Sequence, residues 1–193
     1  LYGVTCGEKN ILLTNNDSAY ETAISLIQKG IKVEAIIDNR EQVNSKLVKE
    51  VEKNNIKIFK GFTVVNTSGY KRINKVSIMQ LSKDGEKVIG SKTTLNCDCL
   101  GVSGGWTPAV HLFTQSGGKL RFREEDQVFI PLTYNSKQIS IGSCNGDFTL
   151  DEILTNTPKL LIKFLEIKDT NYDNVDVKSS YSKLKRNIWL LPS

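Results

Sequence analysis

The first forty residues alternate between apolar runs and polar turns in a way that predicts a βαβ unit. Residues 11–14 form one short apolar run and residues 31–37 form a second, so each suits a buried strand. Between them, residues 19–28 place alanine, leucine and isoleucine side chains on one face of a helix. A strand, a helix and a strand at this spacing predict two parallel strands joined by a right-handed crossover.

Two local signals mark the ends of this predicted helix. Ser18 is followed three residues later by Glu21, and this spacing predicts a capping box at the helix start. Gly30 stands where a residue in the left-handed conformation commonly follows a helix. The helix should therefore begin near Ser18 and end just before Gly30.

The pattern continues to residue 105 with further strands. We expect a helix, a strand, three antiparallel strands with hairpin turns at Ser68–Gly69 and Asp84–Gly85, and a returning strand. In chain order these elements are predicted over residues 41–55, 56–59, 62–67, 72–81, 86–95 and 97–103. This order predicts an α/β fold in which residues 1–105 form a Rossmann-like three-layer half-domain, with a parallel sheet and a β-meander.

After residue 105 the pattern predicts shorter elements. We expect a short helix, two strands, a glycine-containing turn and two helices over residues 109–115, 128–131, 138–141, 142–147, 150–154 and 158–166. Residues 106–157 should be the return segment of an adjoining FAD/NAD-type half. Residues 158–193 should hold a helix, a polar linker over 169–182 and an apolar tail over 188–192, leading toward a further domain. Because the chain starts at Leu1 without a methionine, we expect it to be an internal piece of a longer protein.

Candidate ligand-binding residues follow three of the predicted parallel strands. The first helix presents free N–H groups that suit a phosphate, and an acid after the second strand suits ribose hydroxyls. The carboxyl ends of parallel strands lie at one edge of a sheet, where α/β proteins bind their ligands. The sequence therefore predicts a dinucleotide site made by Asn15, Asn16, Asp17 and Ser18 after the first strand, by Asp38, Asn39 and Arg40 after the second, and by Gly104, Gly105 and Trp106 after the last.

The first turn also supports a different interpretation. It lacks the glycines that let a backbone approach a pyrophosphate, and Asp17 would repel a phosphate. The alternative is a degenerate half-domain that has lost its ligand and acts as an interaction scaffold. Both interpretations stay open, whereas a stand-alone NAD(P)H-dependent reductase ranks last because the chain has no Cys-x-x-Cys pair and no flavin fingerprint.

Composition limits the remaining function classes. The net charge of +5 is not gathered into a long basic block, so nucleic-acid binding is not indicated. No apolar run approaches membrane-spanning length and no signal peptide opens the chain, so we expect a cytoplasmic protein that does not enter a membrane.

The side chains that could carry chemistry are few. The only histidine, His111, belongs to no recognisable Ser-His-acid or Cys-His set, so we expect no catalytic residues and an inactive chain when it is alone. The four cysteines, Cys6, Cys97, Cys99 and Cys144, have neither zinc-site nor redox-pair spacing. We expect no metal site and four reduced thiols, with Cys97 and Cys99 on opposite faces of one strand.

Four stretches resemble a known family, the alpha subunit of heterotetrameric sarcosine oxidase. They cover residues 11–39 with the string Thr-Asn-Asn-Asp-Ser-Ala-Tyr, residues 103–112 with Ser-Gly-Gly-Trp-Thr-Pro, residues 115–121, and residues 189–192 with Trp-Leu-Leu-Pro. The resemblance covers most of the chain except residues 158–185. The Asn-Asn-Asp-Ser-Ala-Tyr and Ser-Gly-Gly-Trp strings carry it most specifically.

The resemblance implies a place in a cytoplasmic bacterial complex with beta, gamma and delta subunits. Such a complex oxidises sarcosine to glycine with oxygen, forms hydrogen peroxide and passes the one-carbon unit to tetrahydrofolate. It implies that the catalytic flavins belong to the beta subunit and that the alpha subunit carries a tightly bound NAD of structural role. The glycine-rich amino-terminal segment of the family is absent from this sequence, so NAD is expected for the parent subunit and is open for this chain.

Overall fold

The computed structural model describes residues 3–133, 138–167 and 177 of the 193-residue chain. The predicted apolar tail over 188–192 lies outside the described residues, as does the predicted linker over 169–182 apart from residue 177. The described residues fall into two compact units, residues 3–105 and the residues from 106 onward, which are presented separately.

A four-stranded parallel sheet is the centre of the first unit. Its strands lie in the order β3-β2-β1-β7, and each neighbouring pair is parallel. Their bounds are β1 Lys9–Thr14, β2 Lys32–Asp38, β3 Lys57–Lys60 and β7 Cys99–Ser103. Two helices, α1 Ser18–Gln28 and α2 Lys46–Lys53, follow β1 and β2. The predicted β-α-β-α-β order is confirmed.

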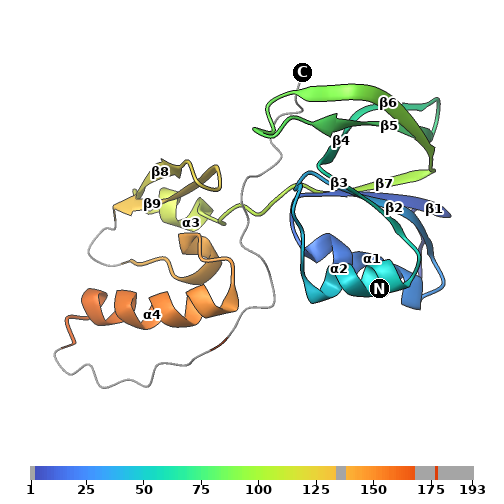
Figure 1. Ribbon diagram of the computed structural model, residues 1–193. Helices are drawn as coiled ribbons and strands as arrows, with labels where there is room; N and C mark the ends of the chain where they lie inside the picture. Colours follow the sequence, from blue (N-terminus) through green and yellow to red (C-terminus); the bar gives the residue numbers. More distant parts are fainter. Residues whose placement is uncertain (1–2, 134–137, 168–176, 178–193) are drawn as a thin grey trace. The chain divides into compact units, whose positions relative to one another are not determined.

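Three antiparallel strands form a second sheet in the same unit. They are β4 Phe62–Gly69, β5 Ile73–Leu81 and β6 Val88–Asn96, in the order β4-β5-β6. Figure 1 shows α1 and α2 on one side of the parallel sheet and these strands on the other. The predicted three-layer α/β fold, a parallel sheet with a β-meander, is therefore confirmed.

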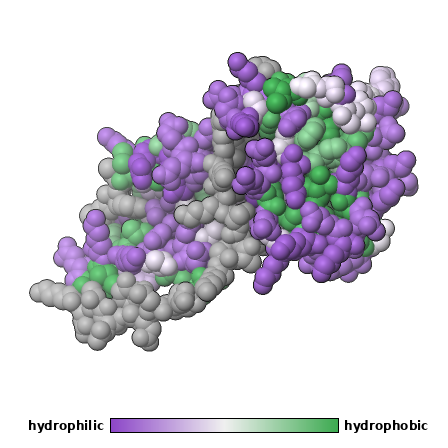
Figure 2. All heavy atoms as spheres, viewed as in Figure 1, coloured by the Kyte–Doolittle hydropathy of each residue, from purple (hydrophilic) through white to green (hydrophobic). Residues whose placement is uncertain are grey.

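Alternation along the parallel strands explains the three layers. In β1, Leu12 packs in a cluster with α1 and α2, whereas its neighbours Ile11 and Leu13 pack in a cluster with Val64 and Val76 of the meander. Successive side chains of a strand point to opposite faces, so a strand buried on both faces must be apolar at nearly every position. In the space-filling view, apolar residues show between the layers and hydrophilic residues dominate the outward faces (Figure 2).

The ends of α1 confirm one local prediction and correct another. Gly30 has φ +73°, and its N–H donates to the carbonyl of Ile27 at 2.8 Å, as expected after a helix end. The predicted Ser18 capping box is wrong, because Ser18 is the first helical residue and Asp17 precedes it as the N-cap residue. The Ser18 hydroxyl instead donates to Oδ1 of Asn16 at 2.6 Å, so it joins the preceding turn.

The second unit contains a short helix, a β-hairpin, a 3₁₀ turn and a longer helix, in that order. Its elements are α3 His111–Gln115, β8 Lys119–Arg123, β9 Val128–Thr133, the turn η1 Gly142–Asn145 and α4 Leu150–Phe164. The sequence prediction missed β8, which is short and alternates charged and apolar residues as Lys-Leu-Arg-Phe-Arg. Antiparallel pairing with β9 makes this segment a strand. The predicted strand over 138–141 is wrong, because in the described part of the chain β9 pairs with β8 alone.

The predicted helices over 150–154 and 158–166 are one continuous helix, α4. Pro158 lies inside it, where its missing N–H removes one backbone hydrogen bond. The backbone N–H groups of Phe148 and Thr149 donate to the Glu152 carboxylate at 3.3 Å each, which secures the start of the helix. Among the described residues, no helix has both the length and the apolar character needed to cross a membrane.

Candidate site at the carboxyl edge of the parallel sheet

The carboxyl ends of β1, β2 and β7 meet at one edge of the parallel sheet. Thr14 pairs in register with Asp38 on one side and with Ser103 on the other. The turn after β1, the residues after β2 and the residues after β7 are therefore neighbours. Hydrogen bonds and ion pairs join most of the predicted site residues there, namely Asn15, Asn16, Asp17, Ser18, Asp38, Arg40 and Gly104.

Arg40 links two buried carboxylates at this edge. Its Nη1 lies 2.9 Å from Oδ1 of Asp17, and its Nη2 lies 2.8 Å from Oδ2 of Asp38. The Asp17 and Asp38 side chains are 0% exposed and the Arg40 side chain is 10% exposed. The edge therefore holds an ion pair network shielded from water, in which two acids share one guanidinium group.

The Asp38 carboxylate has its hydrogen-bonding capacity filled by this chain. Oδ1 accepts from the backbone N–H of Arg40 at 2.9 Å and from its Nε at 3.0 Å. Oδ2 accepts from the Tyr20 hydroxyl and from Arg40 Nη2, both at 2.8 Å. Because a carboxylate accepts about four hydrogen bonds, a ribose hydroxyl could bind Asp38 only by displacing one of these donors.

Burial and charge also set the protonation of the two donors. Burial raises the pKa of the Tyr20 hydroxyl well above its ordinary value of 10.0, and the neighbouring Asp38 raises it further. Burial alone would lower the pKa of Arg40, but the hydrogen bonds and charges of Asp38 and Asp17 outweigh it and raise that pKa. Tyr20 thus stays a neutral donor and Arg40 a cation.

The turn between β1 and α1 is closed by its own side chains. The backbone N–H of Asn16 donates to the Thr14 hydroxyl at 3.0 Å, and that of Ser18 donates to Oδ1 of Asn16 at 3.1 Å. The Asn16 amide in turn donates to the carbonyl of Ser103 at 3.0 Å, and the Asn15 amide donates to that of Gly104 at 3.0 Å. The backbone N–H groups of Asn16 and Ser18 lie where a phosphate would bind, and both already donate to acceptors within the chain.

Asp17 occupies the position of an anion at the start of α1. As the N-cap residue of an 11-residue helix, it places a buried carboxylate near the partial positive charge of the helix N-terminus. The helix dipole and Arg40 together balance the two carboxylates of the network. A phosphate would have to displace Asp17 or lie against its negative charge.

The other predicted residues contribute less to this network. The backbone N–H of Asn39 donates to the carbonyl of Thr14 at 2.9 Å, which extends the pairing of β1 and β2. Gly105 has φ +136°, a conformation that favours glycine, at the end of the first unit. Trp106 begins the second unit, and its side chain is half-exposed there.

Sequence reasoning missed two members of the site, Tyr20 and Ser103. The sequence pattern places Tyr20 among the inward-facing residues of α1, where its ring is buried. Its part in the site is the hydrogen bond that its hydroxyl group donates to Asp38. Ser103 ends β7, and its hydroxyl lies 3.2 Å from that of Ser18. Both residues carry a hydroxyl group on a side chain predicted to lie near the strand ends, and this signal could have identified them.

The described residues offer little chemistry beyond this edge. No group of three or more histidine, cysteine, aspartate or glutamate side chains among them could hold a metal ion. His111 starts α3 and is exposed. The family relationships of this chain are therefore carried by its fold and its sequence, and not by a set of catalytic residues.

Comparison with known proteins identifies relatives of part of this chain. No known family profile matches it. A sarcosine oxidase alpha subunit from Corynebacterium sp. (strain P-1) is 32% identical over 149 residues, which are 76% of this chain and 15% of the relative. The alpha subunit from Corynebacterium sp. (strain U-96) is 29% identical over 145 residues, 75% of this chain and 15% of the relative. The chain is a homologue of part of the sarcosine oxidase alpha subunit.

This relationship confirms the resemblance predicted from the sequence motifs. The chain spans about 15% of the length of the sarcosine oxidase alpha subunits it matches. Those proteins are named as subunits, so they belong to a multi-subunit enzyme.

Solved structures support the same fold. The thioredoxin reductase of Lactococcus lactis matches with a TM-score of 0.52 and 15% identity, over 72% of this chain and 45% of that protein. The L-proline dehydrogenase of P. horikoshii matches with a TM-score of 0.51 and 17% identity, over 99% of this chain and 33% of that protein. At such identities the likeness concerns the fold alone, which is the FAD/NAD(P)-binding, Rossmann-like fold of these oxidoreductases.

Proposed function

We propose that this chain is a structural part of a sarcosine oxidase-type alpha subunit, and that its parallel sheet serves assembly and not nucleotide binding. The parent complex would oxidise sarcosine to glycine with oxygen and tetrahydrofolate in the cytoplasm. Beta, gamma and delta subunits would be its partners, and the catalytic flavins would lie outside this chain. The relatives, all named as alpha subunits of that enzyme, support this assignment.

The observation that carries the structural role is Arg40 buried between Asp17 and Asp38. Removing one partner from a buried ion pair costs about 3–5 kcal/mol. A hydrogen bond between a ribose hydroxyl and a carboxylate returns about 1.5–3 kcal/mol. A ligand of millimolar affinity binds with only about 4 kcal/mol in total, so opening the network would cancel such binding.

A second candidate function is dinucleotide binding at the same edge. It is favoured by the parallel order β3-β2-β1-β7, which brings the predicted site residues together at the carboxyl ends of the strands. NAD is the ligand predicted from the resemblance, and FAD is the other dinucleotide that a fold of the FAD/NAD(P)-binding type would take. This candidate requires Arg40 to leave Asp38 when the ligand enters.

Co-purification tests the proposed structural role. When the chain is co-expressed with the beta, gamma and delta subunits of a sarcosine oxidase, we expect it to elute with them as one species in size-exclusion chromatography. The chain alone should form no hydrogen peroxide from sarcosine. Separate elution under conditions where both sides are folded, or peroxide formation by the chain alone, would contradict the proposal.

A further inference from the structure

The segment before β1 is folded back onto the start of β7. The Asn10 amide donates to the carbonyl of Gly7 at 3.1 Å, which closes a turn over residues 7–10. The Asp98 carboxylate accepts from the backbone N–H groups of Glu8 at 3.0 Å and Lys9 at 2.8 Å. The backbone N–H of Asp98 donates to the carbonyl of Lys9 at 3.1 Å. Three hydrogen bonds to Asp98 therefore hold this segment beside the start of β7, and the fourth closes its turn.

Gly7 marks the point of closest approach. It is buried, and a Cβ atom built there would lie 2.7 Å from Cβ of Cys99 and would also clash with the Asp98 carboxylate. Only glycine fits at such a contact, so the backbone of the segment lies directly against Cys99. Cys6 is the residue before Gly7, and consecutive Cα atoms are about 3.8 Å apart.

The two thiols at this contact differ in exposure. Cys6 is exposed and Cys99, the first residue of β7, is half-buried. Burial raises the pKa of the Cys99 thiol, and the charge of the nearby Cys6 raises it further. Cys6 is thus the accessible thiol that meets an oxidant first, with Cys99 next to it.

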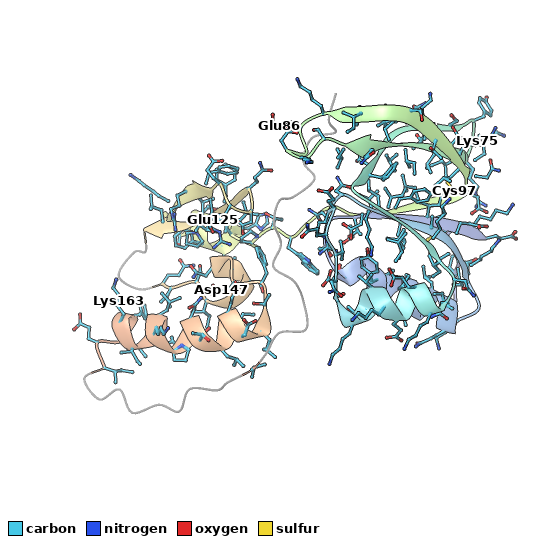
Figure 3. The ribbon with its side chains drawn as sticks, viewed as in Figure 1. Lys75, Glu86, Cys97, Glu125, Asp147 and Lys163 are labelled. Atoms are coloured by element: carbon cyan, nitrogen blue, oxygen red, sulfur yellow. The ribbon has the colours of Figure 1, made fainter. Side chains whose placement is uncertain are left out.

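The other two cysteines differ from this pair in their surroundings. Cys97 is buried in the core cluster between β1 and the meander, and Figure 3 labels it there. The prediction that Cys97 and Cys99 lie on opposite faces of one strand is wrong, because Cys97 precedes β7 in the link from β6. Burial of Cys97 in the core shields its thiol from an oxidant in solution. Cys144 is exposed in η1 of the second unit.

We propose that Cys6 and Cys99 are an oxidation site that forms an intramolecular disulfide in the presence of a hydroperoxide. The Cys6 thiolate attacks the hydroperoxide, takes one oxygen as a sulfenic acid and releases an alcohol, or water from hydrogen peroxide. The Cys99 sulfur then attacks the Cys6 sulfur and water leaves. Two thiols are oxidised, one peroxide bond is reduced, and the new bond ties the segment before β1 to β7.

The test uses the full chain treated with hydrogen peroxide in slight excess. After digestion without reductant, mass spectrometry should find the Cys6 and Cys99 peptides joined with the loss of two hydrogen atoms, and free thiols should fall from four to two per chain. Cys144→Ser should leave the link unchanged, and Cys6→Ser should abolish it. Because Cys6 is exposed, the Cys6→Ser variant should keep the circular dichroism spectrum of the wild type.

A second variant tests the geometry. Gly7→Val should slow the formation of the link at least tenfold, because its side chain would displace the segment from Cys99. The proposal is overturned if Cys6 ends as a sulfinic acid with Cys99 still a free thiol. It is equally overturned if the link joins Cys6 to another chain or to Cys97, or if Gly7→Val forms the link at the wild-type rate.

Discussion

Replacing Arg40 with alanine is expected to destabilise the 3–105 unit by about 3–5 kcal/mol. The substitution leaves the Asp17 and Asp38 carboxylates buried without their shared cation, and both side chains are fully shielded from water. It also removes two of the four hydrogen bonds that Asp38 accepts, those from Arg40 Nε and Nη2. The backbone N–H of residue 40 and the Tyr20 hydroxyl still donate to Asp38. Urea unfolding followed by circular dichroism at neutral pH measures the loss.

Lys32→Ala is the matched control for Arg40→Ala. Lys32 also pairs with an acid, since its Nζ lies 2.7 Å from Oε1 of Glu34, but its side chain is 65% exposed. Exposed pairs of this kind contribute about 0–1 kcal/mol. If Arg40→Ala cost no more than Lys32→Ala, the buried network would not hold the edge of the sheet together.

Tyr20→Phe is expected to cost about 1.5–3 kcal/mol at neutral pH, because it removes a buried hydrogen bond to a charged acceptor. The ring keeps its packing in the core beside Ala23 and Ile36, so the loss reports the hydroxyl group. Tyr70→Phe is the control, since Tyr70 is 97% exposed and should change stability by less than about 0.5 kcal/mol. A loss from Tyr20→Phe as small as that of Tyr70→Phe would contradict the role of the hydroxyl group.

The effect of Tyr20 should depend on pH with a defined sign. Its pKa in the folded protein lies above the ordinary 10.0, so the unfolded chain loses the Tyr20 proton first as pH rises. The free energy of unfolding should then fall above about pH 10. The wild type should lose more stability than Tyr20→Phe between about pH 9 and about pH 11, so the difference between them should shrink. A difference that grew with pH would reverse the assigned shift.

Much of the first unit could be predicted because each layer has its own periodicity. The near-continuous apolar runs of β1 and β2 indicated a sheet buried on both faces, and the hairpin turns indicated the meander. The second unit was predicted less well. The short strand β8 alternates charged and apolar residues, and α4 contains Pro158, so local patterns there favour wrong boundaries.

The candidate site was predicted as a location but not as an arrangement. Strand order alone brings the residues after β1, β2 and β7 to one edge, and the sequence indicated Asp38 and Arg40 there. The pairing of Arg40 with both Asp17 and Asp38 depends on tertiary packing that no local spacing encodes. The same holds for Tyr20, whose hydroxyl reaches across from α1 to the end of β2.

Calorimetric titration of NAD into the full wild-type chain tests most directly whether this edge is closed by the chain's own side chains. With the Asp17–Arg40–Asp38 network intact, we predict no saturable heat up to about 1 mM NAD, and the same for FAD. One-site binding with a Kd below about 100 μM that Asp38→Ala weakens at least tenfold, in a variant that remains folded, would contradict the account and would make this edge a dinucleotide site.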